Sequence, residues 1–285
     1  MERRAFRAMG TEIELIVDAE EAEAALEAAE HEFHRLEALL SRFREDSELS
    51  RLNAAGSLDA GPDLVRVVEL AVGARARTGG RFDPTVHDAL VAAGYDRSFE
   101  LVVSTPGAPP APDAPVHAPG AIRVADGRIA LEPGTRIDLG GIGKGYASER
   151  AAEILGTAGP CLVNAGGDIA TRGGAWPVGV DTAAEPLTLE LSGSSALATS
   201  GRDRRRWSRD GRELHHLIDP STGLPSETDL VRVTVVARDA VEAEVAAKAL
   251  FLVGSGPAAA EAEDAGIPAV LVAVDGRTIL TGGLG

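Results

Sequence analysis

The sequence predicts an α+β fold, and three observations support this class. Segments with the two-residue alternation of strands occur in runs, and segments with helical spacing lie between those runs. Hydrophobic residues make up 44% of the chain and charged residues 25%, which is ordinary for a globular protein. A length of 285 residues is sufficient for a sizeable core, in one large domain or in two fused lobes.

The first third of the chain predicts a strand followed by helices. Residues 6–18 alternate apolar and polar side chains, as a half-buried strand does. Residues 20–41 and 62–78 carry apolar side chains at helical spacing. Between these two helices Ser47 is suited to cap a short turn. A further short helix is predicted to end at Ala93.

The remaining chain predicts mainly strands. Residues 104–120 carry six prolines among many alanines, which favours an exposed loop. Asp126-Gly127 lies between two short apolar segments and predicts a hairpin over residues 122–131. Helices are predicted from Asp239 to Val253 and in one later segment. Further strands are predicted at residues 136–139, 162–169 with a turn on two glycines, 177–180, 187–191, 195–199, 215–219, 231–237, 269–274 and 278–281.

Charge and cysteine content exclude several classes of function. The formal net charge of −16 argues against non-specific binding to nucleic acid or to an anionic membrane. The single cysteine, Cys161, excludes an internal disulfide and a cysteine-based zinc cluster. No apolar segment approaches the ~20 residues of a membrane span, and residues 1–6 lack the apolar segment of a signal peptide. We therefore expect a cytoplasmic protein with no nucleic-acid partner and no membrane insertion.

The glycine-rich stretch from Arg136 to Glu149 is the strongest candidate for an anion site. Four glycines within six residues allow the backbone to turn several N–H groups inward, and a predicted helix follows. Lys144 adds a full positive charge, so the stretch suits a phosphate or pyrophosphate. A Walker A loop would need glycine at Asp138, and the dinucleotide fingerprint would need glycine at Tyr146. From the glycines alone, a tight strand-to-helix turn without a ligand is the alternative.

Six segments, taken in order, resemble the FAD:protein FMN transferases, the ApbE-like flavin transferases. Each segment alone is a weak signal, but six in register form a specific one. The resemblance extends from Met9 to Val253 and covers most of the chain. The six segments are Ser47–Asn53, Gly80–Pro84, Asp138–Tyr146, Asn164–Asp168, Thr199–Gly201 and His215–Gly223.

The resemblance implies a single domain over residues 1–285, built as two intertwined lobes with mixed or antiparallel sheets and packed helices. It implies that FAD is the donor and that FMN moves through a phosphoester bond onto a Thr or Ser hydroxyl of a target flavoprotein, with release of AMP. Magnesium normally assists in this family. Two alternatives remain open: an FAD-binding protein without transfer activity, and an FAD pyrophosphatase that yields FMN and AMP.

The resemblance also implies the site residues. His216, Lys144 and Glu244 are implied as catalytic. FAD contacts are implied at Met9, Phe43, Arg81, Phe82, Asp83, Asp138, Gly141, Lys144, Gly145, Gly166, Gly167, Asp168, Ser200, Gly201, His216, Ile218 and Asp219.

Several of these residues also have a purely structural interpretation. Phe43 replaces a tyrosine that is frequent in the family, so it keeps a stacking ring without the hydroxyl, or else is a core aromatic. Asp83 and Asp219 each precede a proline and are suited to cap a helix or begin a turn. His215 and His216 are neighbours on a predicted strand, so their side chains point to opposite faces. We expect a structural or surface role for His215.

The implied magnesium site departs from the family pattern. The resemblance places one ligand at the Ala147 carbonyl, another at Glu244 where the family has aspartate, and the third at Lys248 where the family has threonine. Residues four apart share a helix face, but an ammonium repels a cation that requires oxygen ligands. Either a weakened site remains at Glu244, Asp219 and the Ala147 carbonyl, or Lys248 replaces the metal and Glu244 holds the lysine. A plain Glu–Lys surface pair is the structural alternative, and we favour replacement of the metal.

Overall fold

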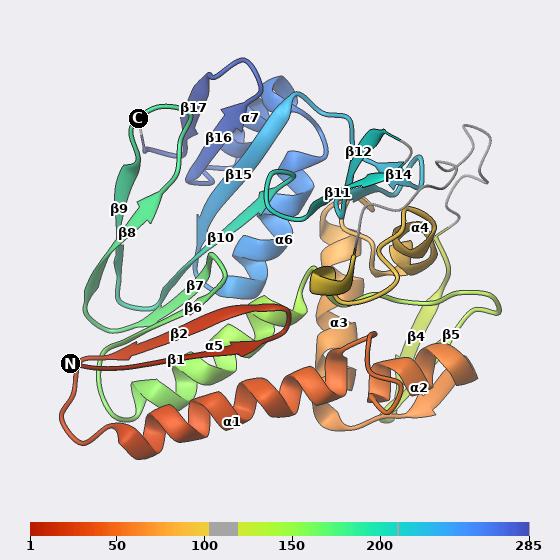
Figure 1. The fold of residues 1–285 in the computed structure, drawn as a ribbon, viewed down its shortest axis with the longest axis horizontal. Helices are drawn as coiled ribbons and strands as arrows, with labels where there is room; N and C mark the ends of the chain where they lie inside the picture. The colour runs from red at the N-terminus through yellow and green to blue at the C-terminus, as the bar shows by residue number, and fades with distance from the viewer. Residues whose placement is uncertain (103–118, 210, 285) are drawn as a thin grey trace. The chain divides into compact units, whose positions relative to one another are not determined.

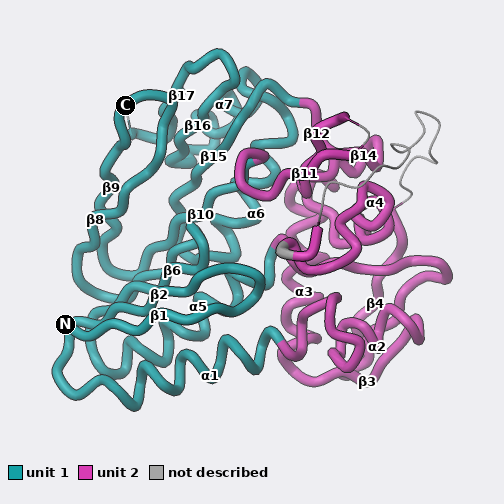
Figure 2. The backbone as a smooth tube through the Cα atoms, in the orientation of Figure 1, with its two compact units in different colours: residues 1–37, 142–201, 228–285 teal, residues 38–141, 202–227 magenta. Residues whose placement is uncertain are grey.

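Contacts between residues divide the chain into two compact units (Figure 2). Unit 1 comprises residues 1–37, 142–201 and 228–285, and unit 2 comprises residues 38–141 and 202–227. The structure is a computed structural model that describes residues 1–102, 119–209 and 211–284. Nearly all of the predicted proline-rich loop at 104–120 lies outside the described residues.

An eight-stranded sheet organises unit 1, and all of its neighbouring strands pair antiparallel (Figure 1). This architecture confirms the predicted α+β class. In spatial order its strands are β1 (Glu2–Ala8), β2 (Thr11–Val17), β6 (Cys161–Ala165), β7 (Asp168–Arg172), β10 (Ser195–Gly201), β15 (Leu230–Ala237), β16 (Ala269–Ala273) and β17 (Thr278–Thr281).

Two hairpins of this sheet turn on residues with positive φ. The predicted strand is confirmed over Thr11–Val17, where Ile13, Leu15 and Val17 are buried, but its extension back to residue 6 is wrong. The chain reverses at Met9 and Gly10, where φ is 52° and 66°. The predicted turn on Gly166 and Gly167 is confirmed, and it joins β6 to β7 with φ values of 67° and 104°. Glycine adopts such φ values without steric cost, whereas the same φ at Met9 is strained.

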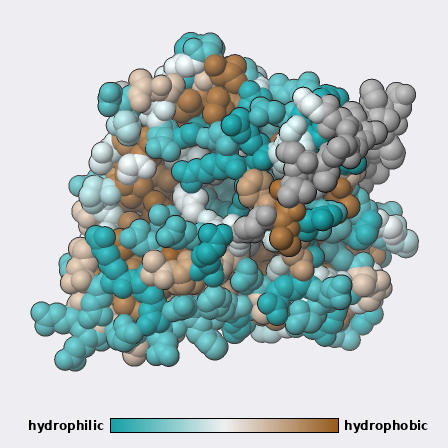
Figure 3. Space-filling view, viewed as in Figure 1, coloured by the Kyte–Doolittle hydropathy of each residue, from teal (hydrophilic) through white to brown (hydrophobic). Residues whose placement is uncertain are grey.

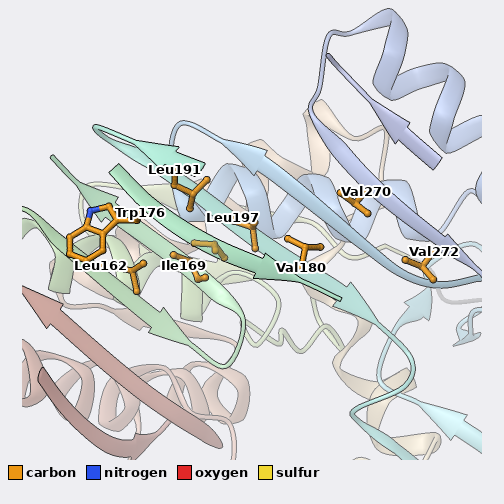
Figure 4. Packing of buried hydrophobic residues seen from close by; sticks show 9 residues of the cluster. Leu162, Ile169, Trp176, Val180, Leu191, Leu197, Val270 and Val272 are labelled. Carbon is orange, nitrogen blue, oxygen red and sulfur yellow. The ribbon is translucent and has the colours of Figure 1, made fainter. Parts of the chain in front are cut away.

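The two faces of the sheet are covered differently. Helices α5 (Gly143–Gly156) and α6 (Ala240–Phe251) pack on β6, β7, β10 and β15. On the other face the hairpin of β8 (Ala175–Val180) and β9 (Leu187–Ser192) brings its apolar side chains onto the sheet (Figure 4). This cluster consists of Leu162, Ile169, Trp176, Val178, Val180, Leu191, Leu197, Val270 and Val272. Burying each large side chain contributes roughly 1.5–3 kcal/mol.

Two further helices complete unit 1 and lead into unit 2. Helix α7 (Ser255–Asp264) packs on β16 and β17. Helix α1 (Glu23–Leu40) buries the predicted apolar stripe, and its Phe33 packs edge-on against Phe6 of β1. The predicted cap of α6 is confirmed, because the Asp239 side chain accepts a hydrogen bond from the Glu242 N–H.

Unit 2 is built from short helices and small sheets. Its α-helices are α2 (Glu48–Ala55), α3 (Pro62–Arg77) and α4 (His87–Ala92), with 3-10 turns η1 (Pro84–Val86) and η2 (Phe99–Leu101). Its sheets are β3 (Ser57–Asp59) with β5 (Arg128–Leu131) and β4 (Ile122–Ala125), β11 (Arg206–Arg209) with β12 (Arg212–His215), and β13 (Ile218–Asp219) with β14 (Leu224–Pro225). The predicted Ser47 cap is confirmed, since Ser47 Oγ accepts from the Ser50 N–H at 2.9 Å.

The segment before the glycine loop is not the predicted strand. The Ile137 N–H donates to Asn53 Oδ1 at 2.8 Å, and the Ile137 carbonyl accepts from Asn53 Nδ2 at 2.8 Å. A side-chain amide therefore occupies the place of a neighbouring strand. The helix after the loop begins at Gly143 rather than at Tyr146.

Hydrophilic side chains cover much of the face of the molecule seen in Figure 3, with apolar side chains between them. None of the helices in the described part of the chain combines the length and apolar composition that a membrane span requires.

Candidate functional site

Lys144 lies between two buried carboxylates in unit 1. Its ammonium forms an ion pair with Asp168 at the start of β7, and it lies 2.7 Å from Glu244 Oε1 on α6. The side chains of both acids are 5% exposed. Because water competes little at such a site, each charge depends strongly on its partners. The structure thus brings together three predicted residues from three distant segments.

Helices α5 and α6 each cap the N-terminus of the other. Glu244 Oε2 accepts a hydrogen bond from the Gly145 N–H in the first turn of α5, at 2.9 Å. In return, Glu149 Oε1 of α5 accepts from the Ala240 N–H, the first residue of α6, at 2.6 Å. Helix N-termini carry unpaired N–H groups and a partial positive charge, so a carboxylate stabilises each of them. No local sequence pattern marks Glu149 as a cap, because its partner lies 91 residues along the chain.

Gly145 permits the close approach of these two helices. A Cβ atom at this position would lie 2.7 Å from the Ala240 carbonyl oxygen and 2.8 Å from its carbon. Real Cβ atoms essentially never come this close to backbone. The glycine is therefore required by packing, in addition to any contact of its N–H with a ligand.

The other predicted residues of unit 1 lie on turns and strand ends. Met9 donates its N–H to Glu37 Oε1 at 2.6 Å, and Gly167 donates its N–H to Asn164 Oδ1 at 2.9 Å. Ser200 and Gly201 end β10. The two remaining positions are helical: buried Ala147 on α5, and partly buried Lys248, one turn after Glu244 on α6.

Asp138, in unit 2, is held by a buried arginine that sequence analysis did not identify. Arg42 Nε lies 2.6 Å from Asp138 Oδ2, and the two side chains are 5% and 13% exposed. Asp138 Oδ1 accepts from the Gly140 N–H at 2.9 Å, which fixes the start of the glycine loop. Nothing in the sequence pattern links the segment around Arg42 to the loop, so only the fold reveals this pair.

An aromatic group surrounds the same arginine. The Arg42 guanidinium carbon lies 4.2 Å from the Phe43 ring centroid and 4.9 Å from that of Tyr95. Tyr95 in turn packs against Trp207, with centroids 5.6 Å apart. Phe43 is 38% exposed, so the interpretation as a core aromatic does not fit. Its ring rests on Arg42 and Tyr95 and keeps an accessible surface.

Residues 81–83 make hydrogen bonds within unit 2. Asp83 Oδ1 accepts from the Thr85 N–H and hydroxyl at 2.8 and 2.7 Å, so it caps η1, and its Oδ2 lies 3.4 Å from Arg75 Nε. Arg81 Nε donates to the Thr78 carbonyl at 3.0 Å, and the Phe82 N–H donates to the Thr78 hydroxyl at 3.0 Å. The capping interpretation of Asp83 is therefore correct at the structural level.

The two histidines have different surroundings. His215 is buried, with Nε2 2.9 Å from the Ser226 carbonyl, while the Leu217 N–H donates to its Nδ1 at 3.3 Å. These two partners fit the neutral ring with its proton on Nε2. His216 is partly buried, and its Nδ1 lies 3.4 Å from the Arg205 carbonyl. The structural role that we expected for His215 fits this geometry.

Ile218 and Asp219 form the short strand β13 of unit 2. Ile218 belongs to the apolar cluster that contains Tyr95 and Trp207. Asp219 Oδ1 accepts from the Ser221 N–H at 2.8 Å and from its hydroxyl at 2.7 Å. Asp219 thus stabilises the turn after Pro220, as its structural interpretation predicted.

The described residues offer a poor donor set for a divalent cation. They contain no group of three or more His, Cys, Asp and Glu side chains that could hold a metal ion. Both oxygens of Glu244 already accept hydrogen bonds, from Lys144 and from the Gly145 N–H. Position 248 carries an ammonium instead of an oxygen.

Comparison with known proteins identifies the kind of molecule that has this fold. The model of the ApbE family matches residues 9–271. A protein of Treponema pallidum named FAD:protein FMN transferase is 31% identical over 83% of this chain and 73% of its own length. One from Klebsiella pneumoniae with the same name is 28% identical over 93% and 81%.

Solved structures agree with the sequence comparison. The crystal structure of the ApbE protein of Thermotoga maritima superposes with a TM-score of 0.86 at 26% identity, covering 98% of this chain and 96% of that one. The apo flavinyl transferase ApbE of Pseudomonas stutzeri superposes with a TM-score of 0.82 at 27% identity, covering 98% and 94%.

Replacement of Gly145 by alanine should destabilise unit 1. The added methyl group would overlap the Ala240 backbone, and overpacking of this kind costs about 1–3 kcal/mol. Urea denaturation followed by tryptophan fluorescence measures the effect. In a Trp207→Phe background the signal comes from Trp176 of unit 1 alone.

Gly256→Ala is the matched control for this measurement. Gly256 lies in α7, and a Cβ there meets nothing within 4 Å, so alanine should leave stability unchanged or raise it by up to ~1 kcal/mol. Equal midpoints for Gly145→Ala and the parent protein would show that α5 and α6 do not require this approach.

Acidification should destabilise unit 2 through His215. Burial lowers the pKa of His215, with the Ser226 carbonyl acting in the opposite direction and the Arg202 charge in the same one. The unfolded chain therefore binds more protons than the folded one as pH falls through about 6.5, so stability is lost on the acid side. His215→Gln retains a donor for Ser226 and an acceptor for Leu217. It should lose less stability than the parent between about pH 7.5 and 5.5.

Trp207 fluorescence in a Trp176→Phe background monitors this unit. The control is His31→Gln at an exposed position of α1, which removes one histidine while retaining the buried ring of His215. If His215→Gln follows the parent throughout the range, the neutral assignment of His215 is wrong.

Proposed function

Because the chain belongs to the ApbE family, we propose that it is an FAD:protein FMN transferase. The observation that carries this proposal is the family match over residues 9–271, which includes every residue of the Lys144, Asp168 and Glu244 cluster. The reaction uses FAD as donor and a Thr or Ser hydroxyl of a flavoprotein as acceptor. Assignment to the cytoplasm stays a prediction.

The chemistry is one displacement at phosphorus. The acceptor oxygen bonds to the phosphorus of the FMN half, and the bond from that phosphorus to the bridging oxygen breaks. AMP leaves with the electron pair, and the acceptor hydroxyl loses its proton. Such transfers depend on positioning and on neutralising the phosphate charge more than on covalent chemistry by the protein.

We assign the tasks to residues as follows. The N-terminus of α5, with Lys144, attracts the pyrophosphate, because its N–H groups and the helix dipole favour an anion. His216 accepts the proton of the acceptor hydroxyl, because a neutral imidazole nitrogen is a proton acceptor and this ring is only partly buried. The accessible ring of Phe43 offers a stacking surface for the flavin.

Intact-protein mass spectrometry tests this function. The protein is incubated with FAD and with purified candidate flavoproteins from the same genome, and nucleotides are separated by chromatography. Transfer gives an acceptor heavier by FMN less one water, together with AMP. FMN and AMP without any acceptor would identify a pyrophosphatase. Tight FAD binding without products would identify a binding protein.

His216→Ala should lower the rate of transfer by about two to four orders of magnitude, the range for a positioned acid–base group. The thermal midpoint should change little, because His216 is only partly buried. His215→Gln, which retains the hydrogen bonds of the neighbouring ring, is the control. An active His216→Ala protein, or an equal loss in His215→Gln, contradicts the assignment.

A further inference from the structure

The buried cluster at the start of α5 has a charge that does not favour FAD. Asp168 and Glu244 contribute two negative charges and Lys144 contributes one positive charge, so the three side chains sum to −1. The pyrophosphate of FAD is itself an anion. Since Lys144 is already shared by two acids, an additional positive charge would favour both the binding and the cleavage of a pyrophosphate.

Magnesium fits this role poorly in the present chain. An octahedral ion needs oxygen ligands, and the position one turn after Glu244 is a lysine. The Glu244 carboxylate is held by Lys144 and by the N-terminus of α5. The residues therefore disagree with the metal site that the family resemblance implies.

The positions of the two lysines in the sequence also implicate the helices α5 and α6. Among the 28 Lys and Arg residues of the sequence only Lys144 and Lys248 are lysines. All other positively charged side chains are arginines, yet both lysines lie on the two helices that cap each other, close in sequence to the capping atoms. An ammonium is a compact point charge, whereas a guanidinium is a broad planar fork. Of the two side chains, the ammonium is closer in size to a small metal ion.

The spacing on α6 places Lys248 on the same helix face as Glu244. Residues 244 and 248 are four apart and share one face of the helix. Glu244 on that face reaches the first turn of α5, and Lys248 is partly buried. With Lys248 included, the four side chains sum to zero, whereas adding magnesium as well would give +2.

We propose that Lys248 replaces the metal: its ammonium supplies the positive charge that stabilises the pyrophosphate, and FAD binding needs no divalent cation. This inference rests on the proposed function, because it concerns how the same site accepts FAD. The ammonium also offers hydrogen-bond donors to the phosphate oxygens of the leaving AMP. The bonds that form and break in the transfer are unchanged.

Calorimetric titration of FAD, in EDTA and in millimolar magnesium, tests the proposal. For the native protein the two dissociation constants should agree within about threefold, since a fixed charge replaces the ion. Lys248→Thr restores the oxygen of the family pattern. Its dissociation constant should rise at least about tenfold in EDTA and return towards the native value with magnesium.

Two further variants separate charge from folding. Lys248→Met has neither the charge nor an oxygen, so it should bind FAD weakly in both buffers. The double variant Glu244→Asp with Lys248→Thr restores both implied ligands, and it should bind Mn²⁺ detectably by electron paramagnetic resonance without FAD, where the native protein does not. Arg66→Thr, at an exposed position of α3, removes one positive charge elsewhere and should bind FAD as the native protein does. Thermal midpoints confirm that each variant is folded.

The outcomes distinguish this inference from the proposed function. If the native protein binds FAD only with magnesium, and Lys248→Met retains that requirement, the inference is overturned while the function stands. If a folded native protein binds FAD in neither buffer, the proposed function fails and the inference fails with it. Both the inference and the proposed function are supported if three results are found together. The native protein binds FAD in EDTA, Lys248→Thr abolishes that binding, and magnesium restores FAD binding to the variant.

Discussion

The site in unit 1 depends on the reciprocal capping of α5 and α6. Glu149 and Glu244 each reach the first turn of the other helix, and Gly145 allows the backbones to meet. A carboxylate at a helix N-terminus satisfies N–H groups and favours the dipole, and a cap of this kind contributes roughly 0.5–2 kcal/mol. Each cap requires the other helix to be in place. The two caps therefore stabilise the two helices as a pair.

Electrostatics and packing are coupled through Glu244. One carboxylate oxygen of Glu244 accepts a hydrogen bond from the first turn of α5, and the other accepts one from Lys144. Lys144 also forms an ion pair with Asp168 on the sheet. Removing either acid would leave a buried ammonium short of a partner, which is costly at low exposure. The arrangement of the glycine-rich turn is therefore set by charge pairs that also join helices to strands. An anionic ligand would bind beside two carboxylates and one ammonium, whose charges sum to −1.

Local patterns predicted the fold class and most elements. The stripe of α1, the Ser47 and Asp239 caps and the turn at Gly166 and Gly167 all follow from interactions within a few residues. Two of the errors arose where a nonlocal or strained feature decided the structure. Met9 adopts a positive φ that its residue type does not suggest, and Asn53 replaces a strand beside Ile137.

The site shows the same division between local and nonlocal information. The glycine loop, Lys144 and the acids around it were identified by composition and resemblance. Arg42 and Glu149 were missed, since an ion pair with Asp138 and a cap on Ala240 depend on chain segments that only the fold brings together. Asp83 and Asp219 show that a predicted site residue can have a complete structural role of its own.

The two departures at positions 244 and 248 form one physical change. Aspartate and threonine have short side chains that end in oxygen atoms, and such oxygen ligands suit a small cation held close to the helix. Glutamate is longer by one methylene, so its carboxylate extends to the Gly145 N–H and to Lys144 on the neighbouring helix. A carboxylate committed to those partners leaves a pyrophosphate without the charge that a metal supplies. In the arrangement that we propose, a lysine on the same helix face restores that charge.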